Sequence, residues 1–191
     1  MKGTIVEPIF WFIYAAGAVT CLCLLIYIVG QQGYRQAAND PQAEMAENLA
    51  ERLEQGESPA ALVLRVAPLV DLEKTLSPWV VIYDKRGTPL ESSGQLDGAP
   101  PQPPQGVFEN SGFWRFGHTW QPHEGLRFSI AMVPFQNDKI SGYVVVGRSM
   151  KLAEERIIMI GLKVLIAWVF TMGALFVGSF VGWFTLCQAR K

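Results

Sequence analysis

The sequence has few charged residues. Only 17% of its 191 residues are charged, compared with about 25% in ordinary soluble domains, and half are hydrophobic. The shortage is concentrated in two runs, because residues 9–34 and 164–187 contain no Asp, Glu, Lys or Arg. Each run exceeds the ~20 residues that a helix needs to cross a bilayer. The composition therefore excludes a soluble enzyme, a disordered chain and a multidomain protein.

Cysteine is absent from the whole region between the two apolar runs. The three cysteines all lie within those runs or at their ends: Cys21, Cys23 and Cys187. The central region therefore has neither disulfides nor a thiolate metal site.

Residues suited to catalysis or metal binding are also few. There are two histidines, His118 and His123, and Glu124 follows the second. A metal site needs three or four ligands, and the residues between these histidines set no ligand geometry. No serine lies in a nucleophile-elbow pattern. We therefore expect no catalysis, no bound metal and no other cofactor.

The central region carries a moderate negative charge. Residues 31–155 contain 16 acidic and 11 basic residues, a net charge of −5. This balance argues against nucleic acid as a partner, because a protein meets phosphates with a basic face. It also argues against docking on an anionic membrane surface. Basic residues flank both sides of the apolar runs, so charge alone does not orient the chain in a membrane.

The first apolar run predicts a transmembrane helix over residues 8–30, preceded by a short tail at 1–7. Trp11, Tyr14 and Tyr27 lie towards its ends, where amphipathic rings prefer the lipid headgroups. A cleaved signal peptide is the alternative, but its apolar core would span only ~7–15 residues and would precede a small-residue cleavage site. The run is longer than that and has no such site, so we expect a retained anchor.

The second apolar run predicts a transmembrane helix over residues 156–187, followed by a tail at 188–191. Lys163 lies near its start, where its long side chain reaches the interface. Ala174, Gly178 and Gly182 recur every four residues, a spacing that lets two membrane helices approach closely. Glycine is common in membrane helices, so the spacing also arises by chance. If it marks a packing face, the partner is either the first helix or a second copy of the chain.

The central region begins with two predicted helices. Asp40 and Pro41 are typical of a helix N-cap and first position, and an apolar face follows with a spacing of four residues. Gly56 ends this helix. Ser58 and Pro59 repeat the capping pattern, and the second, shorter helix breaks near residue 68.

The remainder of the region predicts strands. Residues 79–83 form a short apolar run typical of a buried central strand, and a turn at 84–87 leads to a return strand at 90–93. Residues 94–112 are a proline-rich loop with one helical turn at 107–110.

Three further strands are expected over residues 113–120, 126–133 and 140–149, and helical character resumes at 151–156. On the second of these strands, apolar side chains from Leu126 to Met132 alternate with Arg127, Ser129 and Ala131. Together these elements predict an α+β domain with about five antiparallel strands and helices on one face.

The order of these elements resembles the extracytoplasmic sensor modules, of PAS-like or single-Cache type, of bacterial histidine kinases and chemoreceptors. The resemblance is carried by Trp79–Thr88, Leu126–Pro134 and Gly142–Arg156. In the last stretch, such sensors end their sheet and pass a signalling helix into the membrane. The resemblance covers nearly the whole chain but contains no diagnostic motif.

The resemblance implies a sensor domain at residues 31–155 outside the cytoplasmic (inner) membrane, with both tails in the cytoplasm. It also implies a homodimer held through the membrane helices. In the two-component sensors that it resembles, the second span leads into a phosphoacceptor-histidine helix and an ATPase domain. The sequence stops at Lys191 with neither, so we expect the effector to be a separate membrane or cytoplasmic chain.

Four residues are candidates for a small-ligand pocket. Arg115, Trp120 and Arg127 lie on neighbouring predicted strands, and Tyr83 on the first strand could join them. An aromatic floor beside a guanidinium group can hold a small carboxylate or phosphate. Arginine on the outer face of a half-exposed strand is also ordinary, so a structural role is the alternative.

Two functional hypotheses follow. The first is a membrane-anchored sensor or regulatory protein, whose central domain binds a small ligand or a partner protein and signals through its helices to a separate effector. The second is a non-catalytic accessory subunit of a larger membrane complex, for which the small-residue face and short tails are suited.

Overall fold

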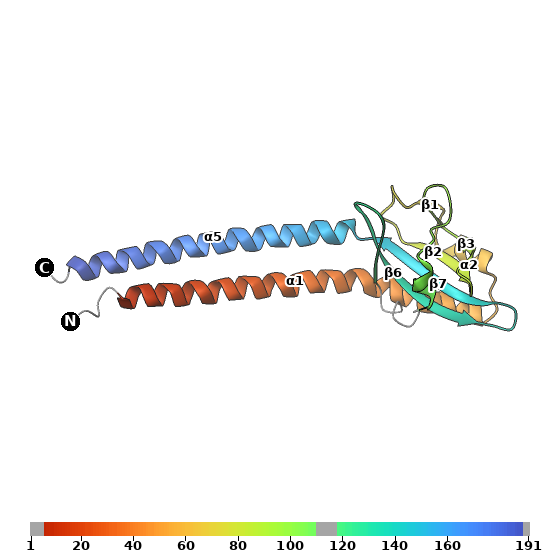
Figure 1. Cartoon of the computed structure of the whole chain (residues 1–191), viewed down its shortest axis with the longest axis horizontal. Coiled ribbons are helices and arrows are strands. Elements are labelled where there is room, and N and C mark those ends of the chain that lie inside the picture. Colours follow the sequence, from red (N-terminus) through yellow and green to blue (C-terminus); the bar gives the residue numbers. More distant parts are fainter. Residues whose placement is uncertain (1–5, 110–117, 189–191) are drawn as a thin grey trace. The chain divides into compact units, whose positions relative to one another are not determined.

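The computed structural model describes residues 6–109 and 118–188 of the chain (Figure 1). These residues belong to two compact units. The first unit comprises the N-terminal segment that ends at Gly33 and the C-terminal segment that begins at Arg156. The second unit comprises Tyr34–Glu155. Residues 1–5 and 189–191 of the predicted tails lie outside the described part of the chain.

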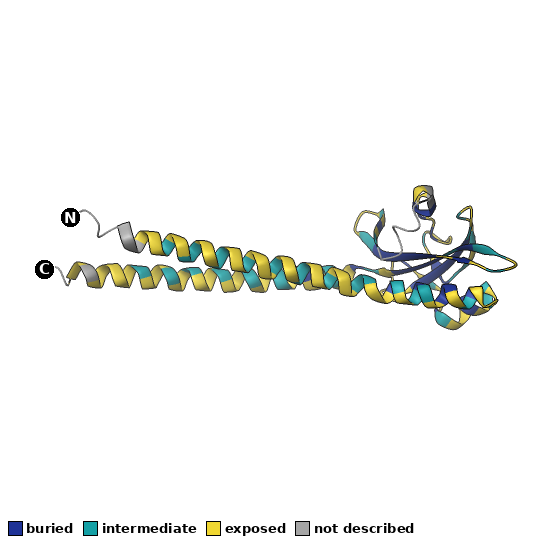
Figure 2. Ribbon diagram, turned by 90° about the horizontal axis from the view of Figure 1, so that it is seen from below, coloured by how far each residue is buried: buried dark blue, intermediate teal, exposed yellow. Residues whose placement is uncertain are grey.

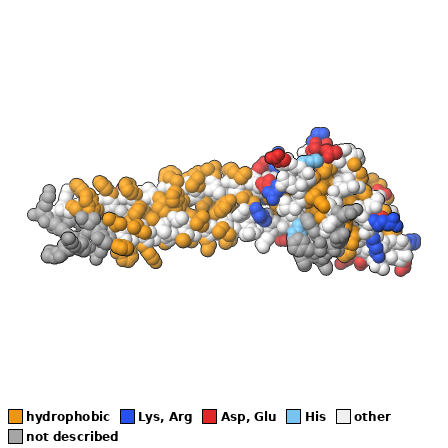
Figure 3. Space-filling view, viewed as in Figure 1, with side chains coloured by type: hydrophobic (Ala, Val, Ile, Leu, Met, Phe, Trp, Pro, Cys, Tyr) orange, Lys and Arg blue, Asp and Glu red, His pale blue; other side chains and the backbone are white. Residues whose placement is uncertain are grey.

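Two long helices, α1 (Val6–Glu54) and α5 (Lys151–Gln188), supply the first unit with their parts before Tyr34 and after Glu155. Both are long and apolar enough to cross a membrane, and the most apolar 18-residue window of each is not buried by the rest of the chain. Figure 3 shows hydrophobic side chains over their visible surface. Such a surface is costly in water and suited to lipid, as the two predicted spans require.

Within the first unit, α1 and α5 contact each other in antiparallel order. The rings of Phe12 and Phe176 lie 6.5 Å apart, and Nε1 of Trp168 donates to Oγ1 of Thr20 at 3.0 Å. Further along, a Cβ at Gly161 would lie 3.2 Å from the ring of Tyr27. The tryptophan N–H and the threonine hydroxyl therefore satisfy each other on helices that otherwise present apolar surface.

The second unit begins with the last part of α1, and the predicted helix start at Asp40 is wrong. Helix α1 continues through Pro41, which lies inside it. An interior proline removes one helical hydrogen bond and costs about 3 kcal/mol. This cost is offset because the turns after Pro41 pack into the core, where the side chains of Ala46, Leu49 and Leu53 are buried.

Helix α1 ends as the sequence predicts. Gly56 has a φ of +92°, a conformation that glycine adopts without strain. The amide of Gly56 donates to the carbonyl of Leu53, and the amide of Glu57 donates to that of Arg52. These two bonds form a Schellman motif. Helix α2 (Pro59–Val66) follows, and the predicted N-cap Ser58 accepts a hydrogen bond from the amide of Ala61.

A five-stranded antiparallel sheet forms the centre of the second unit, as predicted. Its order is β3-β2-β7-β6-β5. The strands are β2 (Trp79–Asp84), β3 (Pro89–Ser92), β5 (His118–His123), β6 (Leu126–Gln136) and β7 (Ser141–Ser149). Strand β2 lies inside the sheet and its first five residues are buried, which confirms the prediction for residues 79–83.

Each face of the sheet packs against its own core. One face, with Val80, Ile82 and Ala131, lies under the end of α1 and under α2. The other face, with Tyr83, Trp120 and Phe128, is covered by loops and by the short helix α3 (Gln105–Glu109). Figure 2 shows the buried sheet between these two layers. Helices therefore lie on both faces rather than on one, although the longer ones share a face.

Two features of the loop region differ from the prediction. Strands β1 (Val70–Asp71) and β4 (Gly94–Gln95) form a small parallel sheet that no periodicity signals, because each has two residues. The strand expected at 113–120 is found at β5 (His118–His123), and residues 110–117 lie outside the described part. Pro122 is accepted within β5 because β5 is an edge strand, where an amide donor is not required at every position.

Close contact between β2 and β7 requires glycine at Gly147. Trp79 and Gly147 are direct neighbours in the register of the two strands. A Cβ at Gly147 would overlap the indole ring of Trp79, which is fully buried. The ring also makes edge contacts with Trp120 and Phe128, at centroid distances of 6.3 and 5.8 Å. The aromatic cluster therefore has no room for a side chain at residue 147.

We expect Gly147→Ala to destabilise the second unit by about 1–3 kcal/mol, because overpacking displaces a buried ring. Chemical unfolding of the full chain in detergent, followed by tryptophan fluorescence, measures the change. Gly33→Ala is the matched control, since a Cβ there has no described atom within 4 Å and alanine favours a helix. Equal stability of the two variants would contradict the packing described.

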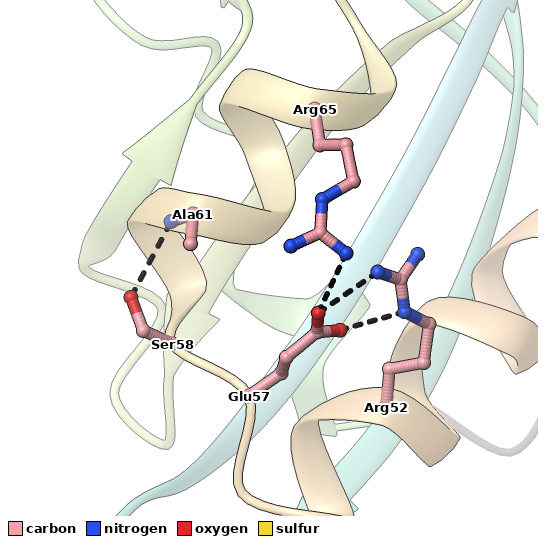
Figure 4. A network of polar contacts seen from close by, with 5 residues as sticks. All are labelled: Arg52, Glu57, Ser58, Ala61 and Arg65. Atoms are coloured by element: carbon pink, nitrogen blue, oxygen red, sulfur yellow. Dashed lines mark hydrogen bonds and ion pairs between the residues drawn. The ribbon is translucent and has the colours of Figure 1, made fainter.

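Glu57 connects α1 and α2 through a small ionic network (Figure 4). Its carboxylate accepts hydrogen bonds from Nε of Arg52 at 2.6 Å and from Nη1 of Arg65 at 2.9 Å. The hydrogen bond from Arg52, helped by both positive charges, holds the pKa of Glu57 below its ordinary value. The ionised form of Glu57 therefore stabilises the pairing of the two helices.

We expect Glu57→Gln to lower the melting temperature of the full chain at pH 7. A carboxylate with a lowered pKa in the folded state stabilises above its unfolded pKa, about 4.3 for glutamate, and this gain is lost as the pH falls through the folded pKa. The difference from wild type should therefore disappear under acid conditions. Glu51→Gln, on the exposed side of α1, is the control, and a pH-independent difference would contradict this interpretation.

Candidate functional site

Two neighbouring side chains of β6 hold the two long helices. Arg127 and Ser129 are two residues apart, so they lie on the same face of the strand. Arg127 contacts the first turn of α5, and Ser129 contacts α1. We call Asn39, Arg127, Ser129 and Glu154 the β6 junction. All four residues belong to the second unit.

The contact to α1 is a hydrogen bond from a buried serine. The hydroxyl of Ser129 donates to Oδ1 of Asn39 at 2.6 Å, and Ser129 is only 1% exposed. A buried hydroxyl that loses its partner costs about 1–3 kcal/mol. The bond therefore fixes the position of α1 along β6 just before Pro41.

The contact to α5 combines an ion pair with a backbone bond. Nη1 of Arg127 lies 2.8 Å from Oε1 of Glu154, and the carbonyl of Arg127 accepts the amide of Met150 at 2.9 Å. Strand β7 ends at Ser149 and α5 begins at Lys151, so only Met150 separates strand from helix. The hydrogen bonds of Arg127 therefore reach both Met150, just before the helix, and Glu154 in its first turn.

The guanidinium group of Arg127 is only partly exposed. Its Nε is buried and has no hydrogen-bond partner among the described residues. A buried polar atom without a partner is costly, so its burial must be compensated by the packing around it. The arrangement suits mechanical positioning, and the junction contains no paired acid and base that would suit catalysis.

The predicted ligand pocket is not assembled from the described residues. Tyr83 is fully buried in the core, its hydroxyl donates to the carbonyl of Pro101, and burial raises the pKa of its phenol. Trp120 packs beside Phe128 on the same face. Arg127 lies on the opposite face of β6, because successive strand residues alternate. Arg115 lies outside the described residues.

The small-residue face of α5 is uncovered in the described chain. Ala174, Gly178 and Gly182 are exposed, and no described atom lies within 4 Å of a Cβ built at either glycine. Helix α1 contacts a different stripe of α5, which includes Gly161 and Trp168. Of the two partners considered for this face, the first helix is therefore excluded within the described residues.

Sequence reasoning missed Asn39, Ser129 and Glu154. The alternation of residues in the sequence of β6 does place Arg127 and Ser129 on one face of the strand. The alternation does not show whether this face meets a helix or solvent. In the structure both faces of β6 are buried, since Ala131, Val133 and Phe135 also pack under the helices.

Comparison with known proteins does not assign a family. No family model matches the chain, and no curated protein or solved structure is significantly similar to it. An antiparallel five-stranded sheet with helices occurs in proteins of many functions, so the fold alone does not identify one. Function has to be argued from the junction and from the apolar helices.

We expect Arg127 and Glu154 to be energetically coupled. Both side chains are more than a third exposed, so the coupling should be about 0.2–1 kcal/mol. A double-mutant cycle with Arg127→Met and Glu154→Gln, measured by chemical unfolding of the full chain, gives this value. The control cycle pairs Glu154→Gln with Arg148→Met, because Arg148 donates to the carbonyl of Leu76 instead. Zero coupling in the first cycle would contradict the role of Arg127.

Proposed function

We propose that the protein is a membrane-anchored sensor or regulatory protein that signals through α1 and α5 to a separate effector chain. The observation that carries the proposal is the β6 junction. One strand holds one helix through Ser129 and the other through Arg127. A ligand or partner that moves β6 would therefore act on both helices at once.

The mechanism needs only a small conformational change. Packed cores switch between discrete arrangements more readily than they deform continuously. A ligand shifts such an equilibrium only by its difference in affinity for the two states. Breaking the ion pair of Arg127 costs about 1 kcal/mol or less, so the first turn of α5 can lose this contact while the sheet and the backbone bond from Met150 remain.

The proposed topology follows the resemblance to sensor modules. The domain would lie outside the inner membrane, both tails would lie in the cytoplasm, and the chain would form a parallel homodimer. The uncovered face at Ala174, Gly178 and Gly182 supports this arrangement, because small residues let membrane helices approach closely. The same face also favours the second function, an accessory subunit that packs against another membrane protein.

We expect a cysteine at Gly178 to crosslink to a second copy of the chain in membranes. The background carries serine at the three native cysteines, and Leu175→Cys is the control, because Leu175 is partly covered within the chain. If the junction transmits signals, Arg127→Met combined with Ser129→Ala should change the crosslinking rate severalfold. A separate experiment tests the topology. In intact spheroplasts, a maleimide that cannot cross the membrane should label Asp138→Cys from outside.

Three outcomes would contradict the sensor proposal or its topology. Crosslinks of Gly178→Cys to a different protein alone, with no self-crosslink, would favour the accessory subunit. A self-crosslink whose rate is unaffected by breaking the junction would show that β6 does not control the helices. Protection of Asp138→Cys from the impermeant reagent would place the domain on the cytoplasmic side.

A further inference from the structure

A second polar group lies at the end of the small parallel sheet. Glu73, Asp97 and His123 each offer one ligand atom, and these atoms all lie within 4.8 Å of one another. Nε2 of His123 and Oδ2 of Asp97 are 3.0 Å apart. The three residues come from three separate segments, so their approach results from the fold and not from sequence proximity.

Strand pairing brings the two carboxylates together. Val70 pairs with Gly94 and Asp71 with Gln95 in parallel, and the amide of Leu72 donates to the carbonyl of Gln95. Glu73 therefore follows β1 at the same edge at which Asp97 follows β4. Asp97 is placed by a tight Asp–Gly turn, in which Asp97 and Gly98 both have positive φ, as a type I′ turn requires.

The hairpin between β5 and β6 supplies the histidine. His123 is the last residue of β5 and pairs with Leu126, the first of β6. Gly125, with a φ of +79°, completes the two-residue connection. The imidazole is thus held at a tight turn that faces the Asp97 turn. The next residue, Glu124, is not a member of the cluster.

The negative charge of the two carboxylates favours a bound cation at the cluster. Two carboxylates approach each other, and the nearby ammonium group of Lys74 is engaged by Asp71 at 2.7 Å. Two carboxylates beside an imidazole make a negatively charged group of oxygen and nitrogen ligands, which a divalent cation would neutralise.

We propose that Glu73, Asp97 and His123 bind a divalent first-row transition-metal ion of the zinc type. Zinc binds histidine nitrogen and carboxylate oxygen at about 2.0–2.2 Å, which places neighbouring ligand atoms roughly 3–3.5 Å apart. The 3.0 Å between His123 and Asp97 fits this spacing. The exposed side chain of Glu73 reaches the metal by rotating, and a water molecule takes the fourth coordination position.

The ligand types distinguish between metals. Imidazole suits zinc, copper, nickel and iron, whereas calcium and magnesium prefer sites made of oxygen alone. The absence of thiolate from the cluster disfavours soft ions such as Cu(I). The site should therefore prefer Zn²⁺ to Ca²⁺ and Mg²⁺.

The location of the site would give the metal a role in the proposed function. His123 pairs with Leu126, and Arg127 of the β6 junction is the next residue. A metal that ties this hairpin to the Asp97 turn would restrict the strand end that carries Arg127. The metal would thus be the ligand of the sensor, an interpretation that rests on the proposed function, whereas the site itself does not.

Zinc binding can be measured on the full chain in detergent, purified without a polyhistidine tag and freed of metal by chelation. Equilibrium dialysis against buffered Zn²⁺, with elemental analysis, should give one ion per chain, retained in excess Ca²⁺ and Mg²⁺. Asp97→Asn, Glu73→Gln and His123→Gln should each weaken binding about tenfold or more, as loss of even an outer contact to a metal ligand costs 10–100-fold. Asp138→Asn and His118→Gln are controls with the same chemical changes elsewhere.

The outcomes separate the site from its signalling role. No bound zinc, or zinc that the three variants retain as well as the controls do, would overturn the metal site. The melting temperatures in chelator should match that of wild type, which shows that the variants fold. Zinc that binds at the site and changes the crosslinking rate of Gly178→Cys would support both proposals. Zinc that binds without changing it would uphold the site and overturn the metal's role as the signal.

Discussion

The organisation of the second unit depends on β6 being buried on both faces. Residues such as Phe128 and Ile130 pack into the aromatic core around Trp79, and the alternate residues meet the helices. A strand enclosed in this way cannot slip by one residue, because a slip would exchange its two faces. Arg127 and Ser129 are therefore presented to α5 and α1 at fixed positions. The polar contacts to the helices follow from the apolar packing of the strand.

The two ends of β6 make different contacts. At its start, the hairpin with β5 places His123 near Asp97 and, a few residues later, Arg127 near Glu154. Beyond its far end, the side-chain amide of Asn137 donates to the carbonyl of Leu53 at 2.6 Å, in the last turn of α1. Helix α1 is thus held at both Asn39 and Leu53.

Much of the fold could be predicted from local signals. Ser58, Gly56 and the alternation of β6 each act through nearest neighbours, and the structure confirms them. The start at Asp40 was wrong because tertiary packing overrides the local effect of Pro41. The sites were less accessible, since Asn39 and Ser129 are 90 residues apart and Glu73, Asp97 and His123 meet only through strand pairing. Tyr83 and Trp120 looked like ligand-binding residues because buried and ligand-facing aromatics have the same sequence pattern.

Native-state hydrogen exchange of the full chain in lipid nanodiscs tests the central claim, that β6 holds both helices. If the junction is one cooperative unit, the amides of α1 around Asn39, those of β6 and that of Glu154 should open with the same free energy. Breaking the ion pair with Arg127→Met should then lower the opening free energy of all these amides by a similar amount. Opening of both helices in the wild type at much lower free energy than β6 would contradict the account.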